Sequence, residues 1–364
     1  VKTGEKRSPS APEAENTVKG AKDAFTETLR TNTSLIRRHL RTPELRLEES
    51  VVGRRSLTKI TVCWVEGLTD PELPKRMRTR LGEIDIDGLL SPAAVEEYVT
   101  GSRKTAFPLL EFTERTDHFC QGLLDGQVGL LVDGLPIGYL APVSFGRLMR
   151  SPEDRATDYL SASMLRILRY LALGVSLLLP GIYAAMAMFH QQMLPTKLLL
   201  SIVESKQDVP FSTLFEVVGL LCAFELLQQA GLHLPQAIGT AVSIIGGLVV
   251  GTAAVDAKLV SPAALIVTAS SGICGFTLPN RDLSDALRLW RLGLTVLGGV
   301  FGLFGVTAGL LLLLIKLAGL ESLGRSYLAP FGEAEVKGAL VRERLAEQKW
   351  RDGTLRPIDE RNQR

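Results

Sequence analysis

Small and hydroxyl-bearing residues recur in the uncharged stretch 237–255, where they could line a path for ions. At about 1.5 Å of rise per residue, a helix of this length just spans the hydrocarbon core of a bilayer. Small side chains let membrane helices approach closely, which predicts a packing seam; hydroxyls and bared backbone equally suit the wall of a water-filled path in an oligomer. Four small residues spaced four apart would form a stripe along one face of this helix, with two threonines beside it. The small residues are Gly239, Ser243, Gly247 and Gly251, and the threonines are Thr240 and Thr252.

Two carboxylates, Glu216 and Glu225, interrupt a second apolar segment, 211–227. An ionised group in the hydrocarbon region costs free energy, so these side chains either face a polar cavity or belong to a segment at the membrane surface. We favour the second interpretation, an interfacial or re-entrant helix that does not cross the bilayer.

Patterns typical of enzymes and metal sites are absent from the sequence, which contains no GxGxxG, P-loop, GxSxG or HExxH motif. Asp85 and Asp87 could hold a cation from one side of an extended chain, but a turn with solvated carboxylates is the favoured interpretation. The sequence therefore predicts no catalytic residue, no metal site, no cofactor and no enzyme activity. The histidines are isolated from any nucleophile pattern: His39, His118, His190 and His233.

Charge and cysteine usage exclude further classes of protein. The formal net charge is +2 over 364 residues, whereas a nucleic-acid-binding protein carries a clear basic excess on one domain. The cysteines lie far apart without CxxC or Cys/His spacing, which predicts reduced, packed thiols. They are Cys63, Cys120, Cys222 and Cys274.

The two halves of the chain differ in composition, and this predicts the domain organisation. Residues 1–20 have the composition of a disordered tail, 21–160 form a soluble α/β domain, 161–320 form a helical transmembrane domain, and 321–364 form a C-terminal tail. The fold class expected is an α+β membrane protein, with an N-terminal cytoplasmic α/β domain followed by an α-helical transmembrane domain. Four spans are predicted, at 170–189, 237–255, 261–279 and 292–315.

The soluble domain is predicted to alternate strands and helices. Residues 57–65, 109–112, 128–132 and 137–141 are strand candidates, and 23–40, 71–81, 93–99 and 117–124 are helix candidates. Asp133-Gly134 is a turn signal that pairs the last two strands. An even number of spans would leave both termini on one side, and we expect that side to be the cytoplasm because the charged domain has no export signal.

Several segments, in one order along the chain, resemble the spore germination protein A family. They include KDAFTETLRTNTSLIRRHL at 22–40, IDIDG at 84–88, LLLPGIY at 177–183, AVSIIGGLVVG at 241–251 and YLAPF at 327–331. The resemblance implies a multi-pass protein in the inner membrane of the endospore. It also implies a homo-oligomeric ring, with a pentamer as one candidate, that conducts ions once nutrient is sensed. Its implied partners are a transporter-like B subunit and a C lipoprotein.

Three departures from the family pattern leave alternatives open. Thr240 and Thr252 stand where glutamine is expected, and Leu221 stands where glutamate is common. Because these changes remove polar groups from the membrane, nutrient gating or ion preference could differ from that of the family. The missing acidic ring also leaves open a non-conducting scaffold that assembles the nutrient-binding partner. A related sporulation ion channel that is not gated directly by nutrient is the remaining alternative.

Overall fold

A computed structural model describes residues 9–12, 15, 19–101, 105–233, 251–331, 337–344, 346–351 and 353–362. The chain divides into two compact units. One, here called the sheet unit, combines Val1–Ile167 with Leu317–Arg364; the other, the helical unit, is Leu168–Lys316.

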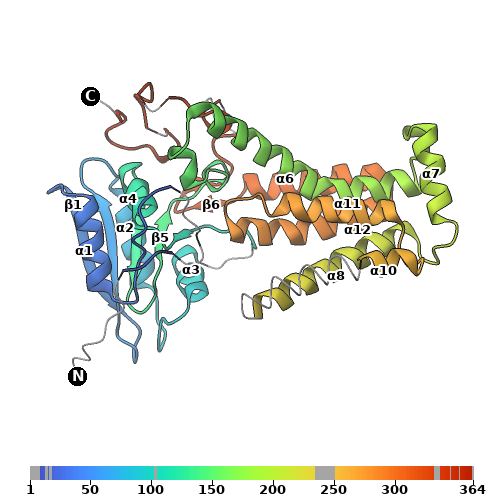
Figure 1. Cartoon of the computed structure of the whole chain (residues 1–364). Coiled ribbons are helices and arrows are strands. Elements are labelled where there is room, and N and C mark those ends of the chain that lie inside the picture. The colour runs from blue at the N-terminus through green and yellow to red at the C-terminus, as the bar shows by residue number, and fades with distance from the viewer. Residues whose placement is uncertain are drawn as a thin grey trace. The chain divides into compact units, whose positions relative to one another are not determined.

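A five-stranded antiparallel sheet organises the sheet unit, in the order β1-β2-β4-β5-β3 (Figure 1). Its strands alternate their side chains between two faces, as period-2 geometry requires. On β2, Ile60 and Val62 face one core, whereas Cys63 and Val65 face the other. The strands are β1 Leu45–Val52, β2 Thr58–Val65, β3 Glu111–Thr113, β4 Val128–Val132 and β5 Gly138–Ala141.

Helices cover both faces of this sheet, which makes a three-layer sandwich. One core is closed by α2 and α3 through residues such as Met77 and Val95. The other is closed by α1 and α4 through residues such as Ile36 and Phe119. The bounds are α1 Leu29–His39, α2 Glu72–Gly82, α3 Pro92–Thr100, α4 Thr116–Leu124 and α5 Phe145–Leu148, followed by the 3-10 turn η1 Pro152–Arg155.

Two glycines let the Phe119 ring approach the sheet closely. A Cβ at Gly138 would come within 2.6 Å of that ring, and one at Gly129 would overlap it. Both strands are buried along their whole length, so the close approach of α4 depends on the missing side chains.

The predicted strands and helices of this domain are confirmed to within a few residues, except that the first helix begins at Leu29 rather than near residue 23. The hairpin at Asp133-Gly134 is confirmed by the antiparallel pairing of β4 with β5. One strand, β1, was not predicted. It is an edge strand whose residues are mostly exposed, so it shows neither a buried run nor a clean alternation.

The expectation of a separate C-terminal tail is wrong for the described residues after 320. The short strands β6 Glu321–Ser322 and β7 Arg325–Ser326 pair with each other, and this segment belongs to the sheet unit. Ser322 Oγ donates to Leu109 O at 2.6 Å and accepts from Val143 N at 3.0 Å. Buried Tyr327 packs on Phe107. Farther on are α13 Lys337–Leu340 and the 3-10 turn η4 Gly353–Leu355.

Part of the predicted disordered tail is also ordered. The Glu15 carboxylate accepts from Thr113 Oγ1 at 2.9 Å and from Glu114 N at 3.3 Å, and Ala24 N donates to Ser10 O. Burial raises the pKa of Glu15. Residues 1–8, 13–14 and 16–18 lie outside the described residues.

The described part of the helical unit contains four apolar helices of unequal length. Three in the described ranges are long and apolar enough to cross a membrane: Tyr159–Met188, Thr213–Gly231 and Arg281–Ala318. The helices are α6 Tyr159–Met188, α7 Thr196–Lys206, α8 Thr213–His233, α10 Gly251–Asp256, α11 Pro262–Gly275 and α12 Arg281–Ala318, with the 3-10 turn η2 Gln191–Met193 between α6 and α7.

These helix bounds differ from the membrane spans expected from the sequence. The segment 211–227, expected at the membrane surface, lies in α8, a helix with the length and hydropathy of a membrane span. The span expected at 261–279 is the shorter helix α11, about 21 Å long. The span expected at 237–255 lies outside the described residues except for its last turn in α10.

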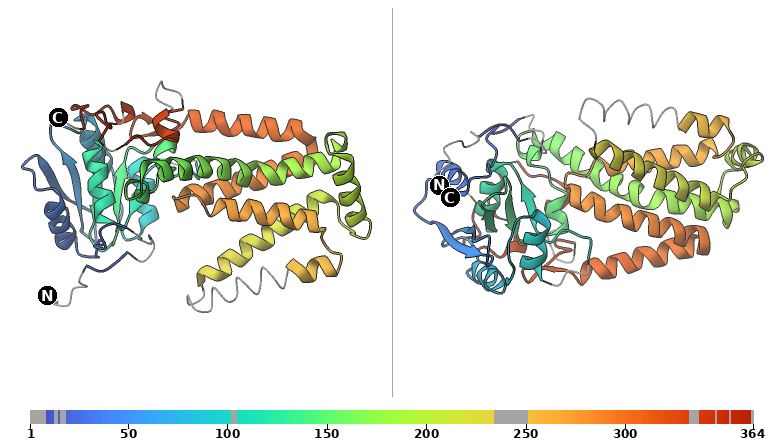
Figure 2. Two further views of the ribbon diagram at one scale, coloured as in Figure 1. Left: turned by 45° about the horizontal axis from the view of Figure 1, so that its top comes forward. Right: turned by 90° about the horizontal axis from the view of Figure 1, so that it is seen from below.

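The stretch 292–315, expected as a single span, does not run straight in α12, because the chain reverses direction at Gly302. Its φ of 64° and ψ of −152° are accessible to glycine and not to a helix. A Cβ on Gly309 would come within 2.5 Å of Leu294, fifteen positions earlier, which only an antiparallel return allows. Figure 2 shows the two halves, 281–301 and 303–318, side by side and joined at one end.

The proline inside α6 is compensated by a neighbouring helix. Pro180 has no N–H to donate to Ser176 O, which would leave that carbonyl unsatisfied in an apolar setting. Ser271 Oγ of α11 donates to Ser176 O at 2.7 Å instead. The carbonyl left open by Pro180 thus becomes a point of contact between α6 and α11.

Candidate functional site

The two carboxylates predicted from the sequence are both held by cations inside the helical unit. Glu216 lies in the first turn of α8 and is buried. Its Oε2 accepts from Ser261 N at 3.0 Å and from Ser261 Oγ at 2.8 Å, while its Oε1 lies 3.3 Å from Lys206 Nζ. Since Ser261 is the N-cap of α11, the carboxylate sits at the end of a helix that favours negative charge.

Glu225 is the centre of a second charged cluster, three turns along α8. Arg291 Nη2 of α12 donates to its Oε1 at 2.7 Å, and Arg288 Nη1 lies 3.5 Å from Oε2. The Arg291 side chain is 4% exposed, against 34% for Glu225. Arg291 also reaches Ser271 Oγ of α11 at 3.5 Å, so this cluster joins α8, α11 and α12.

These partners were not found by sequence reasoning. Arg288 and Arg291 fall three apart beside an apolar run. They lie on the first half of α12, facing Glu225. One sequence pattern would have indicated the cluster. Two arginines three positions apart lie at the edge of one apolar helix, and a single carboxylate interrupts another apolar helix.

Close backbone contacts accompany the charge pairs. A Cβ on Gly181 of α6 would come within 2.9 Å of Leu294 O, and one on Gly298 would lie 2.5 Å from Gly181 O. The two glycines therefore let α6 and α12 touch backbone to backbone, as small residues do between membrane helices.

The predicted stripe of small residues is described only at its end. Gly251 is buried, and a Cβ there would meet the Leu265 side chain of α11 at 3.6 Å, so this position packs against a helix. Thr252 is exposed. Four of the predicted residues lie outside the described part of the chain: Gly239, Thr240, Ser243 and Gly247.

The soluble acids and thiols have ordinary structural roles. Arg54 Nε donates to Asp85 Oδ1 at 2.6 Å, and Arg55 lies 3.5 Å from Asp87, with all four side chains exposed. Among the described residues no three His, Cys, Asp or Glu side chains gather as a metal site would require. All four cysteines are free.

Comparison with known proteins places the chain among germination proteins. The family described as Bacillus/Clostridium GerA spore germination protein matches residues 1–354. Spore germination protein KA of Bacillus subtilis (strain 168) is 37% identical over 93% of this chain, and spore germination protein XA of Bacillus anthracis is 36% identical over 89%. The uncharacterized membrane protein YfkQ of Bacillus subtilis (strain 168) is 36% identical over 94%.

The chain spans 63% of protein KA, 66% of protein XA and 67% of YfkQ. A crystal structure of the N-terminal domain of the A subunit of the Bacillus megaterium spore germinant receptor GerK3 is 38% identical, covering 34% of this chain and 97% of that domain, with a TM-score of 0.29. The match over residues 1–354 and the identities of its relatives show that this chain belongs to the GerA spore germination protein family.

Proposed function

We propose that this chain is the A subunit of a germinant receptor in the inner membrane of the endospore, where it forms homo-oligomers and conducts ions once nutrient is sensed. Its partners are then a transporter-like B subunit and a C lipoprotein. The family match over residues 1–354 carries this proposal. The helical unit supports it with helices long and apolar enough for a membrane.

The stretch 237–255 is the segment that we assign to the ion path, from its hydroxyls and small residues. Exposed Thr252 and buried Gly251 are adjacent and would play different parts, one toward the path and one in the seam against Leu265. Substitutions at these two neighbouring positions therefore make a matched pair of variants for testing the proposal.

A non-conducting scaffold is the second candidate, and the carboxylate contacts favour it. Glu216 and Glu225 are both engaged by cations and hydroxyls of neighbouring helices rather than presented to a water-filled path. Paired charges of this kind fix helix packing.

Ion flux through the purified protein in liposomes, with and without its partner subunits, separates the two candidates. Under the channel proposal, Ser243→Leu and Thr252→Leu reduce flux by narrowing and dewetting the path while oligomers stay intact. Gly251→Leu instead disrupts the packing of α10 on α11, because it adds a side chain beside Leu265. Absence of flux from well-folded wild-type protein with its partners would leave the scaffold as the function.

A further inference from the structure

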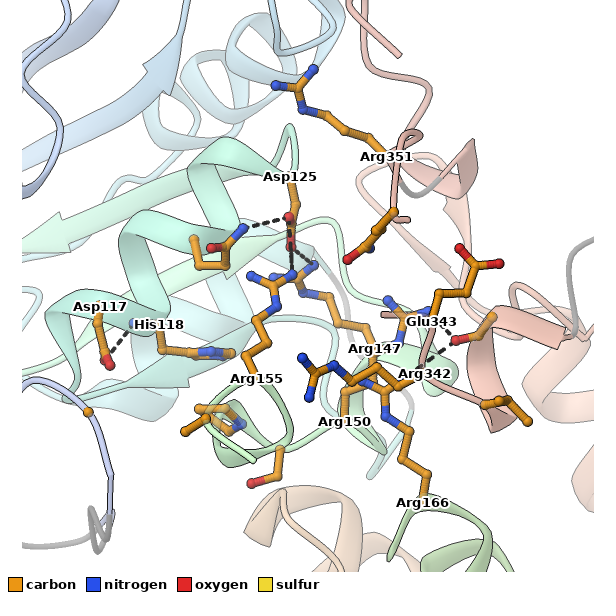
Figure 3. A pocket seen from close by; sticks show the side chains of 18 of the residues that line it. Asp117, His118, Asp125, Arg147, Arg150, Arg155, Arg166, Arg342, Glu343 and Arg351 are labelled. Carbon is orange, nitrogen blue, oxygen red and sulfur yellow. Dashed lines mark hydrogen bonds and ion pairs between the residues drawn. The ribbon is translucent and has the colours of Figure 1, made fainter. Parts of the chain in front are cut away.

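An arginine-lined cavity of about 570 Å³ lies within the sheet unit. Its walls come from α4, from the segment around η1, from the start of α6 and from the C-terminal segment (Figure 3). The volume is in the range of pockets that take small organic ligands. Nothing in the sequence reasoning indicated it, since its arginines are spread from residue 115 to residue 351.

The lining of the cavity holds more cations than acids, although acids behind the lining pair with Arg147, Arg166 and Arg351. The described lining includes three acids, Asp117, Asp125 and Glu343, against eight cations. The cations are Lys19, Arg115, Arg147, Arg150, Arg155, Arg166, Arg342 and Arg351.

Two of the lining arginines, Arg147 and Arg155, share the carboxylate of Asp125. Asp125 accepts from Arg147 Nη1 at 3.0 Å and from Arg155 Nη2 at 3.1 Å, as Figure 3 shows. Burial lowers the pKa of Arg155, and the neighbouring charges of Arg147 and Arg150 lower it further, although Asp125 acts in the opposite direction. Arg147 also pairs with buried Glu111 at 3.1 Å, so Arg155 is the guanidinium whose only carboxylate in these contacts is one that it shares.

Arg342 is held in place by neutral groups. Its Nη1 donates to the backbone carbonyls of Asp154 and Thr157, the latter at 2.7 Å. The side chain is 8% exposed, and its Nε is buried with no hydrogen-bond partner among the described residues. A guanidinium oriented by carbonyls is not paired with a carboxylate there and retains an N–H donor for another ligand.

We propose that this cavity binds a small ligand carrying a phosphate group, with Arg155 and Arg342 as its principal contacts. Arginine forks match phosphate oxygens two at a time, and charge-assisted bonds of this type are about twice as strong as neutral ones. A ligand of two or more negative charges would offset the excess that the protein leaves in the cavity.

Such a ligand would join the two parts of the sheet unit. α4, η1 and Arg166 precede the helical unit in sequence, whereas Arg342, Glu343 and Arg351 follow it. Binding would therefore stabilise the contact between the segments that lead into and out of the helices. This inference is independent of ion conduction.

Titration of the full chain in detergent with sodium pyrophosphate tests the site, with sodium chloride at matched ionic strength as the reference. We expect saturable binding by calorimetry and a rise in Tm that chloride does not give. Arg155→Gln and Arg342→Gln should each weaken binding by about tenfold or more, the loss of one charge-assisted contact. Arg46→Gln, an exposed arginine paired with Glu66 outside the cavity, should leave binding unchanged.

Glu343→Gln provides a test that does not depend on removing an arginine. It deletes an exposed acid of the lining and should tighten pyrophosphate binding by about threefold. Lack of saturable binding, equal effects of chloride, or unchanged affinity in all three cavity variants would each overturn the proposal.

The source of the phosphate is settled by a second arm in lipid nanodiscs. A lipid headgroup as ligand predicts that phosphatidic acid, compared with phosphatidylcholine, raises the Tm of wild type and not of Arg155→Gln. A free phosphate ester predicts that pyrophosphate raises the Tm in phosphatidylcholine nanodiscs and that phosphatidic acid does not. A lipid effect that is equal in both proteins counts against the site.

Discussion

At the scale of single residues, the contacts of Glu225 and Arg291 explain how charges are tolerated in an apolar unit. The guanidinium is almost fully buried, and its carboxylate partner comes from another helix. Neither charge would be stable there alone, because the desolvation of an ion exceeds what any neutral neighbour returns. Together they specify which faces of α8 and α12 meet.

Removing Glu225 should cost about 3 kcal/mol of the free energy of unfolding, since the Arg291 charge stays buried. Removing Arg291 should cost less, because Glu225 is 34% exposed and keeps Arg288 as a partner. We expect Glu225→Leu to lower the Tm in detergent strongly, Arg291→Met to lower it less, and the double variant to recover much of the loss. The control is Asp285→Asn, which removes an exposed i, i+3 partner of Arg288 and should cost less than about 0.5 kcal/mol. A double variant as unstable as the sum of the two single ones would contradict the pairing.

A second residue-scale prediction concerns pH. Burial alone would raise the pKa of Glu111, but His118 at 2.8 Å and Arg147 at 3.1 Å lower it to about 2. Its contribution, about 3 kcal/mol, is therefore present above the unfolded pKa of 4.5 and is lost as pH falls from there through about 2.

The free energy of unfolding of wild type should thus exceed that of Glu111→Gln at pH 6, and the difference should vanish near pH 2. Burial raises the pKa of Asp125, but the charges of Arg155 and Arg147 lower it, so that its net shift is downward. Asp125 therefore makes the free energy of unfolding rise with pH in wild type and in Glu111→Gln alike. Asp85→Asn, at an exposed carboxylate, is the matched control. A constant difference between wild type and Glu111→Gln across this range would show that the carboxylate is not held as described.

At the scale of elements, glycine decides where helices turn and how closely they pack. Gly181 and Gly298 let α6 and α12 meet backbone to backbone, and Gly302 folds α12 into a hairpin. The long apolar run that a hydropathy window treats as one span is divided at that residue, because its φ and ψ lie outside the helical region.

Gly302→Ala should destabilise the protein by about 1–3 kcal/mol. The new Cβ would enter a conformation that L residues avoid and would lie 2.7 Å from His190 Cε1. Gly293→Ala is the matched control: it lies in the first half of the same helix, and a Cβ there meets no atom within 4 Å. It should be neutral or stabilise by up to about 1 kcal/mol. Equal Tm values for the two variants would rule out the turn at Gly302.

At the scale of the whole molecule, the sheet unit is built from both ends of the chain, and this constrains how the segment between them can cross a membrane. Residues before 168 and after 316 form one compact unit, tied by Ser322 to Val143 and by Arg325 to Asp70. A chain whose ends fold together must leave the bilayer on the side where it entered. We therefore expect an even number of crossings, which would leave both termini on one side.

Cysteines at exposed Leu57 and Ile358 should react with an impermeant maleimide from the same side of sealed vesicles, in a Cys222→Ser background that removes an exposed thiol. Because each site lies in a different part of the sheet unit, labelling from opposite sides would show that the two parts do not fold together. A protein labelled at both sites only after detergent places the unit inside the vesicle, and one labelled at both sites without detergent places it outside.

The sequence by itself determined the family, the division into a charged and an apolar part, and most strands and helices of the sheet unit. These depend on composition, ordered motifs and local periodicity, which are properties of neighbours along the chain. The hairpin of β4 and β5 followed from two turn residues, and the long helix α6 followed from its apolar run.

Only the tertiary structure decided which distant groups meet. It brought Arg291 to Glu225, Ser271 to the carbonyl that Pro180 leaves open, Ser322 to Leu109, and the arginines of the cavity to one another. Each contact joins residues of different elements, so its formation depends on how those elements pack. Sequence periodicity shows which face of a helix is apolar, but the partner of a buried charge is set by packing across the fold.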